Sequence, residues 1–587
     1  MKHFQFKLSV LILAMILLAQ FSSAAQADSK KIDGFGIGSG THLRVGTTGL
    51  SAALDEQQWM GVHWSREDLP WEEVEGTRGN FQTTYPFDYG SGIYALRDYN
   101  MLLTESAKRD IQVVFILGAR AGYMAPRGRG NYIPTPDEFQ QQWEEYVTWA
   151  VNTFGDQVSA WEINNEMNSR MFWGKVVSPT LDGKVDPDPA FYYERILQPA
   201  YRIIKQKDPN DIIILGGLVT ITDSDCATNP FVYLGQLHDL GAWNSFDAIG
   251  FHPYWDTNPE AFIQRGKAHD PNTGACMEGM TATRNLIGEM REARDLANKF
   301  GSKPIWVTEI GWNESWLASR AAERDTSTDV IEADYLVRTY VPLLSENGID
   351  KIFWYTQIEH PLATNEDFRL GNNGKQALRN LSILLNGGEA LGQVQGQNDK
   401  GGAADDDAYE YRFKNNGKTI IVAWKARGGD APRTVSIQNI PTESVRVYQA
   451  DAADISDTTG NELIVVSNSV NVDLTERPVF IVFEETNAAK KAWDDFIINL
   501  GKWWDKQNEA IQRQIKEWRD EQTKKLADWF DQWWEDFQKQ LADWFEQQAI
   551  GFLEQLCNGS AFILPSLAVM IAVSRKHRHS GHWDDGK

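Results

Sequence analysis

The stretch that decides the fold is Trp161-Glu162-Ile163-Asn164-Asn165-Glu166, in which a short apolar run ends in two amides and a carboxylate. A second stretch of the same kind comes much later, Trp306-Val307-Thr308-Glu309-Ile310-Gly311-Trp312. Short apolar runs bounded by polar residues are consistent with buried strands. We therefore interpret both stretches as strands that each end near a glutamate.

On either side of these stretches, apolar runs alternate with amphipathic stretches from about Ile32 to Leu385. This alternation is typical of parallel strands joined by crossover helices. The predicted strands are Gly34–Gly38, Met60–Trp64, Val113–Leu117, Ala160–Asn164, Ile212–Leu215, Ala248–His252, Ile305–Glu309 and Ile352–Tyr355. The predicted helices include Phe139–Thr153, Tyr192–Lys205, Ala282–Phe300 and Val330–Leu344. Eight β/α units predict an α/β fold, a (β/α)₈ TIM barrel, with Glu166 and Glu309 at the carboxyl ends of its fourth and seventh strands, where barrel chemistry collects.

The hydrophobic pattern of the chain changes beyond the Gly- and Asp-rich break at Gly387–Asp407. Short alternating strands and turns such as Asn415-Asn416-Gly417-Lys418 predict a small β-sandwich. Its core is predicted to contain Phe413, Ile420, Val422, Val435, Val445, Val447, Val479 and Ile481. A supporting role packed against the barrel is favoured over sugar binding.

A long Trp-rich segment without proline follows, and its apolar positions step by threes and fours as in an amphipathic helix. The motif Leu526-Ala527-Asp528-Trp529-Phe530 recurs as Leu541-Ala542-Asp543-Trp544-Phe545. Membrane-surface helices usually carry basic residues on the polar face, whereas this segment is acidic. Self-association as a stalk or helical hairpin is therefore preferred, with membrane contact as the second reading.

Both ends of the chain have the form of targeting segments. Lys2 and Lys7 precede an apolar run, and Ala25-Gln26-Ala27 offers a cleavage site, as in an export signal. The tail combines Cys557, a short apolar run and a basic cluster, which resembles bacterial C-terminal sorting tails. We expect a secreted protein held at the cell surface, in five parts: signal peptide 1–27, barrel 28–388, sandwich 389–486, helical stalk or assembly segment 487–556 and tail 557–587.

Composition excludes several classes of function. The net charge of −24 in 587 residues argues against nucleic acid as a partner. The chain has no His-Glu-x-x-His or Cys-x-x-Cys motif and no phosphate-binding Gly-rich loop, so we expect neither a bound metal nor a cofactor. Cys226 and Cys276 lie in polar segments, and a disulfide between them is plausible in an oxidising compartment.

The two glutamates suggest a particular chemistry. Cleavage of a glycosidic bond through a covalent intermediate needs one carboxylate to attack the anomeric carbon and one carboxylic acid to protonate the leaving oxygen. The two carboxyl groups must then lie about 5–5.5 Å apart. Two strand ends of one barrel can supply that separation.

Several motifs resemble those of the clan A glycoside hydrolases: Asn165-Glu166, Thr308-Glu309, His252-Pro253-Tyr254 and Trp354. A further set is similar to the family 39 barrels of β-xylosidases and α-L-iduronidases: Gly61-Val62-His63-Trp64-Ser65-Arg66-Glu67-Asp68, Trp71, Val74-Glu75 and Gly79-Asn80-Phe81. Met167 departs from this pattern, because many relatives have proline after the first glutamate.

The resemblance implies a role for each matching residue. Glu166 corresponds to the general acid/base, Glu309 to the nucleophile and Asn165 to a donor to the sugar 2-hydroxyl. Arg66, with His252 or Tyr254, would lower the pKa of Glu309, while the negative Glu309 would raise that of Glu166. Trp354 would offer an apolar face to a sugar ring.

These roles imply a retaining glycoside hydrolase acting on a β-linked oligo- or polysaccharide. The alternative is an inactive barrel that binds polysaccharide as a surface adhesin. Sugar and linkage depend on cleft loops such as 118–135 and 222–230.

Overall fold

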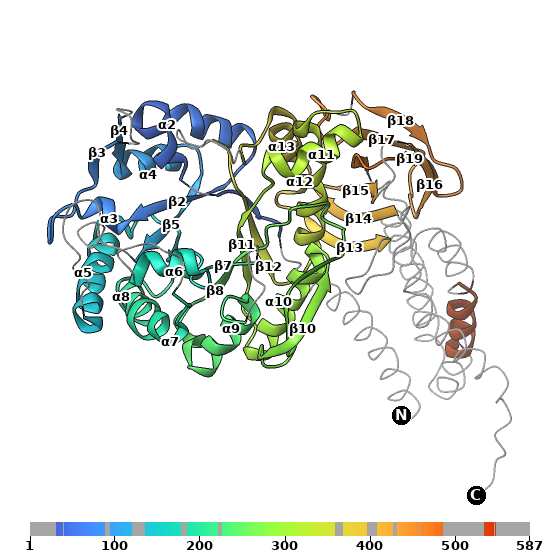
Figure 1. Cartoon of the computed structure of the whole chain (residues 1–587). Coiled ribbons are helices and arrows are strands. Elements are labelled where there is room, and N and C mark those ends of the chain that lie inside the picture. Colours follow the sequence, from blue (N-terminus) through green and yellow to red (C-terminus); the bar gives the residue numbers. More distant parts are fainter. Residues whose placement is uncertain are drawn as a thin grey trace, which may run out of the picture.

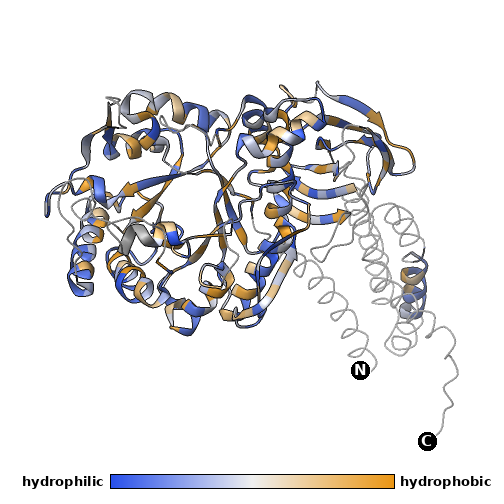
Figure 2. Ribbon diagram, viewed as in Figure 1, coloured by the Kyte–Doolittle hydropathy of each residue, from blue (hydrophilic) through white to orange (hydrophobic). Residues whose placement is uncertain are grey.

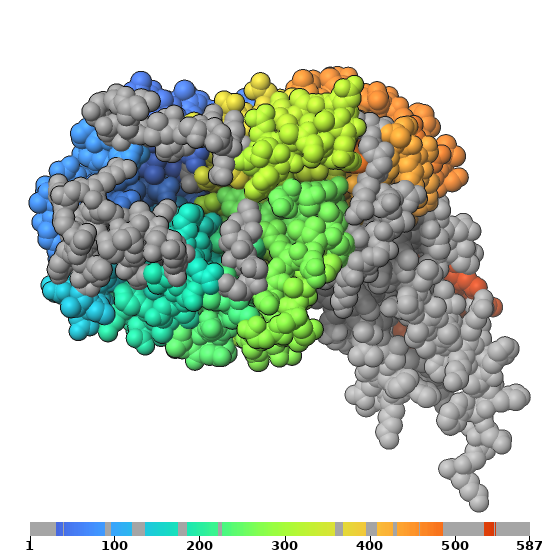
Figure 3. Space-filling model, in the orientation of Figure 1, coloured from blue at the N-terminus to red at the C-terminus, as the bar shows by residue number. Residues whose placement is uncertain are grey.

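The computed structural model describes residues 31–484, apart from 39, 89–93, 120–134, 178–184, 221–225, 359–367, 396–407, 427–430 and 457, together with 533–544 and 546. Two bodies of structure dominate it: a closed barrel, and an antiparallel sandwich beside it (Figure 1). In the space-filling view, the face of the barrel is hollowed between its blue and its green elements (Figure 3).

The barrel consists of eight parallel strands in the closed order β1-β12-β11-β8-β7-β6-β5-β2. The strands are β1 Phe35–Ile37, β2 Trp64–Pro70, β5 Gln112–Gly118, β6 Ala160–Ile163, β7 Ile212–Val219, β8 Ala248–His252, β11 Ile305–Ile310 and β12 Ile349–Trp354. The predicted (β/α)₈ barrel is thus confirmed.

One predicted strand, Met60–Trp64, is wrong. Met60 ends the preceding helix α2 (Thr41–Trp59), and its backbone N–H bonds to the carbonyl of Glu56. Gly61 then turns the chain with a left-handed φ of 71°, which glycine adopts without steric cost. The second strand therefore starts only at Trp64.

Helices pack around the outside of the barrel. Their bounds are α3 Trp71–Val74, α4 Tyr99–Ala107, α5 Pro136–Phe154, α6 Arg170–Val177, α7 Pro189–Phe191, α8 Gln198–Lys207, α9 Pro230–Asp239, α10 Leu286–Phe300, α11 Glu314–Glu323, α12 Thr328–Ser345 and α13 Asn372–Leu385. The helix predicted over Tyr192–Lys205 begins as a π-helical turn, η2 (Tyr192–Leu197), and a 3₁₀ turn, η3 (Ala242–Ser245), follows α9. The helix predicted from Ala282 begins only at Leu286, because Cys276–Arg284 is strand β10, paired with β9 (Ile263–His269). A second hairpin joins β3 (Thr84–Asp88) and β4 (Tyr94–Asp98).

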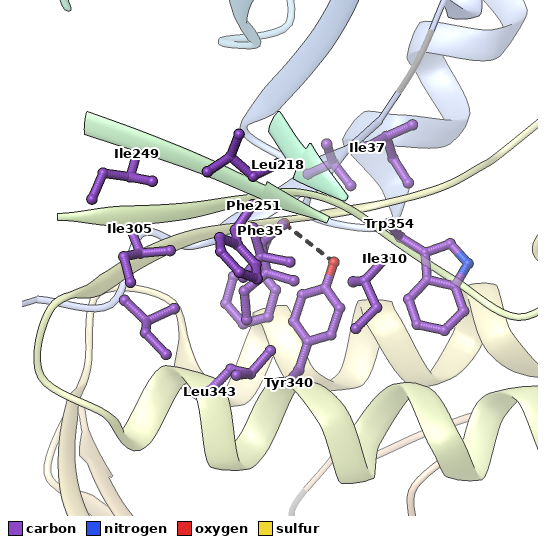
Figure 4. Packing of buried hydrophobic residues seen from close by; sticks show 14 of the residues in the cluster. Phe35, Ile37, Leu218, Ile249, Phe251, Ile305, Ile310, Tyr340, Leu343 and Trp354 are labelled. Atoms are coloured by element: carbon purple, nitrogen blue, oxygen red, sulfur yellow. Dashed lines mark hydrogen bonds between the residues drawn. The ribbon is translucent and has the colours of Figure 1, made fainter. Parts of the chain in front are cut away.

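The core has an inner and an outer layer. Inside the barrel, alternate positions of the strands supply Trp64, Val114, Ala160, Ile214, Ala248, Trp306 and Phe353. The opposite faces of the strands pack against the helices, and Figure 4 shows this layer where Tyr340 of α12 reaches the strands. Figure 2 shows the barrel strands as largely hydrophobic and the outer helices as two-toned. This is the pattern expected of strands covered on both faces.

Two barrel strands carry one extra residue at the end that bears polar side chains. Val307 pairs with Ile352 whereas Ile310 pairs with Trp354, so β11 advances by three residues while β12 advances by two. In the same way, β7 advances from Leu215 to Leu218 while β8 advances from Ile249 to Phe251. Such β-bulges re-aim side chains and are common next to active sites.

The sandwich contains a six-stranded sheet and a two-stranded sheet. The larger has the order β13-β14-β15-β20-β17-β18, and the smaller pairs β16 with β19. Their bounds are β13 Glu389–Gln395, β14 Ala408–Asn415, β15 Lys418–Lys425, β16 Arg433–Gln438, β17 Ser444–Gln449, β18 Asn461–Ile464, β19 Ser469–Leu474 and β20 Val479–Glu484.

The central strands of the larger sheet, β14, β15 and β20, are buried on both faces. One face covers the small sheet through residues that include Val445, Val479 and Ile481, with Val435 and Val447 at the margin. The prediction that Phe413, Ile420 and Val422 belong to this core is wrong, because these side chains join the core of the barrel. The sandwich is packed against the barrel, as its predicted supporting role requires.

The predicted disulfide is present between Cys226 and Cys276, and it links the segment after β7 to β10. Residues 533–544 are helical, with Trp533, Trp534 and Phe537 in mutual contact. The rest of the predicted stalk, the export signal and the tail lie outside the described residues. Within the described parts of the chain, every helix is too short or too polar to cross a bilayer.

Candidate active site

An ion pair inside the barrel forms the floor of the site. The Arg66 guanidinium from β2 donates to both carboxylate oxygens of Glu162 from β6, at 2.5 and 3.0 Å. Both side chains are fully buried. Glu162 also accepts the backbone N–H of Gly217, at 2.9 Å. The sequence motif contained Glu162, but its pairing with Arg66 joins strands that are distant in the chain.

Arg66 also binds Glu309, one of the two predicted catalytic residues. Nη1 of Arg66 donates to Glu309 Oε1 at 2.6 Å, and the Tyr254 hydroxyl donates to Oε2 at 2.6 Å. The bulge in β11 turns Glu309 toward these groups although the preceding residue, Thr308, also faces the barrel interior. Arg66 and Tyr254, two of the three residues predicted to lower the pKa of Glu309, therefore donate to its carboxylate.

Glu166 enters the site from the turn that follows β6. Its backbone lies in the left-handed region, with φ of 47°, as does that of Asn164, with φ of 63°. For glutamate this conformation is costly, and such residues cluster at functional sites. The Glu166 N–H donates to the carbonyl of Gly217, at 3.0 Å, which anchors the turn to β7. Glu166 Oε1 lies 3.0 Å from Nδ1 of His252.

The two glutamates share one space. One carboxylate oxygen from each and a ring nitrogen of His252 all lie within 4.8 Å of one another. His252 Nδ1 is 3.0 Å from Glu166 and 3.9 Å from Glu309. The oxygens of the two side chains therefore face a common centre and do not open into separate cavities.

The environment shifts the two carboxyl groups in opposite directions. Burial raises the pKa of Glu166 against the hydrogen bond and charge of a protonated His252, and the nearby Glu309 carboxylate adds to this rise. Burial alone would also raise the pKa of Glu309, but a protonated His252, Arg66 and Tyr254 together outweigh it and bring that pKa below its ordinary value. The surroundings thus move the two pKa values apart, with the higher proton affinity on Glu166. The predicted effect of Glu309 on Glu166 is present, but burial is the larger cause.

Asn165 completes the set of predicted residues that converge. Its side-chain oxygen accepts from Arg66 at 2.8 Å, which directs the amide nitrogen away from that contact. The side chain is partly exposed, unlike the buried glutamates beside it. Asn165 is therefore placed to donate to a bound molecule.

The predicted role of Trp354 is wrong. Its ring is fully buried, stacks on Trp312 at 5.7 Å between centroids and lies near Tyr340 of α12 (Figure 4). Side chains alternate along a strand, and on β12 it is Phe353 that faces the barrel interior. Trp354 consequently packs against the outer helices.

The aromatic residue at the site is Tyr355, which sequence reasoning missed. It is partly exposed, its ring centroid is 6.2 Å from that of Tyr254, and its hydroxyl accepts from Arg44 at 3.0 Å. Asp68 on β2 interacts electrostatically with Arg66, Glu309 and Arg44. The signals were present, since Tyr355 adjoins the predicted aromatic and Asp68 lies within the quoted motif. The cleft loops named from sequence lie largely outside the described residues.

The structure resembles that of a family 39 glycoside hydrolase from the gut symbiont Bacteroides cellulosilyticus WH2, with a TM-score of 0.54 and 19% identity over 77% of this chain and 81% of that chain. A family 30 endoxylanase from Clostridium papyrosolvens C71 has a TM-score of 0.44 and 13% identity over 78% of this chain and 97% of its own. No protein-family model matches the sequence, and no curated protein matches it. The likeness is one of fold: the chain forms a closed parallel barrel and resembles the family 39 glycoside hydrolase in that respect.

Proposed function

We propose that the protein is an exported, retaining glycoside hydrolase that acts on a β-linked oligo- or polysaccharide. The observation that carries this proposal is the approach of the Glu166 and Glu309 oxygens to within 4.8 Å. Retaining enzymes need about 5–5.5 Å between their carboxyl groups, whereas inverting enzymes need about 6.5–9.5 Å to admit a water molecule. The separation here supports direct attack by one carboxylate.

Glu309 is the nucleophile in this proposal. Arg66 and Tyr254 each donate to one of its oxygens, at 2.6 Å, and favour the ionised form that attacks the anomeric carbon. The glycosidic bond breaks as the bond to Glu309 forms. The result is a covalent glycosyl-enzyme.

Glu166 is the general acid and then the general base. Because its pKa is raised, Glu166 can hold the proton that the leaving oxygen takes up. Once Glu309 is esterified, its negative charge is gone, so the pKa of Glu166 falls. Glu166 can then take a proton from the water that hydrolyses the intermediate.

Two further observations support the proposed export and the proposed class of substrate. The disulfide between Cys226 and Cys276 supports export, because disulfides persist in oxidising compartments. The half-buried Tyr355, beside Tyr254, supports a sugar ring as ligand, because partly exposed aromatic faces bind apolar sugar faces.

Azide rescue tests the proposal and assigns the two roles. We expect Glu166→Gln and Glu309→Gln each to lower kcat on aryl glycosides by at least about 100-fold. Azide should restore turnover of Glu309→Gly by attacking the anomeric carbon directly, which yields a glycosyl azide of inverted configuration. In Glu166→Ala, azide should attack the glycosyl-enzyme instead and yield the retained configuration.

The matched control is Glu323→Gln, an exposed glutamate at the end of α11, which should keep wild-type turnover. Near-normal activity of either active-site glutamine variant would contradict the proposal. Binding of polysaccharide with no turnover by the wild type would favour the adhesin.

A further inference from the structure

A continuous run of hydrogen bonds connects Glu166 to the arginine that binds Glu309. From Glu166 it passes to His252 Nδ1 at 3.0 Å, and from His252 Nε2 to the Thr308 hydroxyl at 3.0 Å. Thr308 then donates to Glu162 Oε1 at 3.3 Å, and Glu162 is paired with Arg66. His252, Thr308 and Glu162 have no exposed surface, so bulk water offers them no other partner.

The direction of each bond in this run is determined by the number of protons available. A carboxylate paired with a guanidinium only accepts, so the single proton of the Thr308 hydroxyl points to Glu162. The Thr308 oxygen therefore presents a lone pair to His252, and Nε2 of His252 must carry a hydrogen. A neutral imidazole has one N–H, so its Nδ1 presents a lone pair to Glu166. Two lone pairs at 3.0 Å would repel each other, so Glu166 must hold a proton.

We propose that Thr308 is a positioning residue that locks His252 in its Nε2–H tautomer and so makes Glu166 start each turnover protonated. The catalytic meaning rests on the proposed function, whereas the tautomer itself does not. Without the Thr308 hydroxyl, His252 could carry its one hydrogen on Nδ1 and donate it to an ionised Glu166. That state has one proton fewer between the two groups and no acid for the leaving oxygen.

The Nε2–H tautomer of His252 contributes to both halves of the reaction. In the first half, the electron pair of the breaking bond goes to the leaving oxygen, which takes the proton of Glu166. The ionised Glu166 then faces the Nδ1 lone pair, which provides no hydrogen to stabilise its charge. The missing hydrogen offsets part of the fall in proton affinity that follows esterification of Glu309. Glu166 removes a proton from the attacking water as that oxygen bonds to the anomeric carbon and the bond to Glu309 breaks. Glu166 then donates to Nδ1 again.

The charged groups around His252 define the competing state. Glu166 and Glu309 face Nδ1, at 3.0 and 3.9 Å, and the Tyr254 ring lies 6.4 Å from the imidazole. Behind Thr308 lie Glu162 and the Arg66 guanidinium. Two carboxyl groups beside Nδ1 favour an imidazolium, the state in which His252 lowers the pKa of both glutamates, whereas a proton on Glu166 favours the neutral ring. The experiment must therefore distinguish three states: Nε2–H, Nδ1–H and imidazolium.

Nitrogen-15 NMR reads the state of His252 directly. In ¹⁵N-histidine-labelled, deuterated protein, long-range ¹H–¹⁵N correlations distinguish the three states, and the His252→Gln variant identifies the signal among the ten histidines. We expect the Nε2–H form at neutral pH in the wild type and in Thr308→Ser, which keeps the hydroxyl. In Thr308→Val the Nδ1–H form should appear. An Nδ1–H ring or an imidazolium in the wild type would overturn the proposal.

Leaving-group dependence gives a readout that a merely structural role would not move. In Thr308→Val we expect kcat/KM to fall about 10- to 100-fold for an alkyl or sugar leaving group, which needs a proton, and less than about threefold for a dinitrophenyl group, which does not. The basic limb of the pH profile should move to lower pH. Thr308→Ser should keep the wild-type ratio of the two substrates.

An equal loss on both substrates in Thr308→Val would assign Thr308 to packing alone and overturn the proposal. A wild type that cleaves neither substrate would defeat the proposed function, and the NMR measurement would still decide the tautomer. The two failures are therefore distinguishable.

Discussion

Gly217 is the residue that makes room for His252. A Cβ at this position would lie 1.9 Å from Nε2 of His252 and within 2.6 Å of two ring carbons. The imidazole thus lies against bare backbone of β7, where no side chain fits. The N–H of Gly217 also binds Glu162, and its carbonyl anchors the turn that carries Glu166. One glycine therefore positions three side chains of the site.

Adding a single methyl group at this position should impair the reaction without touching a catalytic carboxylate. We expect Gly217→Ala to lower kcat/KM on aryl glycosides by about 100-fold, because displacement by about 1 Å is enough for such a loss. The control is Gly76→Ala, where the new Cβ would have no heavy atom within 4 Å. Equal activity of the two variants, both folded by circular dichroism, would show that His252 need not lie against β7.

Strand β2 serves the site with one face and supports helix α2 with the other. Arg66 points into the barrel, whereas Glu67 points outward and accepts from the backbone N–H of His42 at 3.0 Å and from the Ser65 hydroxyl at 2.7 Å. His42 lies in the first turn of α2, and the N-cap residue Gly40 offers no side chain to that turn. Glu67 therefore satisfies a helix terminus from a neighbouring strand.

Burial raises the pKa of Glu67 to about 7 from its ordinary 4.5, against the hydrogen bonds from Ser65 and His42. Because the folded state holds this proton more tightly than the unfolded chain, the contribution is complete below about pH 4.5 and is lost as pH rises through 7. The variant Glu67→Gln cannot titrate. We therefore expect the free energy of unfolding of the wild type, relative to the variant, to fall by about 3 kcal/mol between pH 4.5 and 8.

Urea unfolding of both proteins over this pH range measures the difference. Other titrating groups cancel, because they are common to the two chains. A difference that stays constant with pH would contradict the assignment of a raised pKa to Glu67.

The barrel and the sandwich are joined by buried ion pairs as well as by apolar contacts. Arg338 of α12 binds both oxygens of Glu260, at 2.9 and 2.5 Å, and the indole N–H of Trp424 in the sandwich donates to the same carboxylate at 2.7 Å. Arg338 also donates to the backbone carbonyls of Ala426 and Glu476, both from the sandwich. Arg338 and Glu260 both belong to the barrel, and Arg338 also pairs with the buried Glu476 carboxylate of the sandwich, at 3.7 Å.

Removing one charge from this junction should be costly. We expect Arg338→Met to lower the free energy of unfolding by about 3–5 kcal/mol, because Glu260 would remain buried without its cation. The matched control is Arg446→Met, whose partner Glu462 is half exposed, and its cost should not exceed about 1 kcal/mol. Chemical denaturation followed by tryptophan fluorescence compares the two. A similar small cost for both would mean that apolar contacts alone hold the sandwich to the barrel.

Local pattern was sufficient for much of this architecture. The apolar runs and their spacing predicted the barrel and the change to a sandwich, because burial on one or both faces leaves a periodic trace in the sequence. The Asn165-Glu166 and Thr308-Glu309 motifs, with Arg66, His252 and Tyr254, marked residues that the structure brings together. Apart from Arg66, which lies within β2, these residues lie at or just beyond the carboxyl ends of strands, where a parallel barrel gathers side chains regardless of chain distance.

What local pattern did not determine is the direction in which side chains point at those strand ends. That direction depends on the register of each strand with neighbours that are far away in sequence, and one extra residue reverses it. The bulge in β11 turns Glu309 inward beside Thr308, and the alternation along β12 sends Trp354 outward and leaves Tyr355 at the site. The sequence by itself therefore determined the fold and the two glutamates proposed to react, and only the packed barrel decided which side chains surround that pair and shift its pKa values.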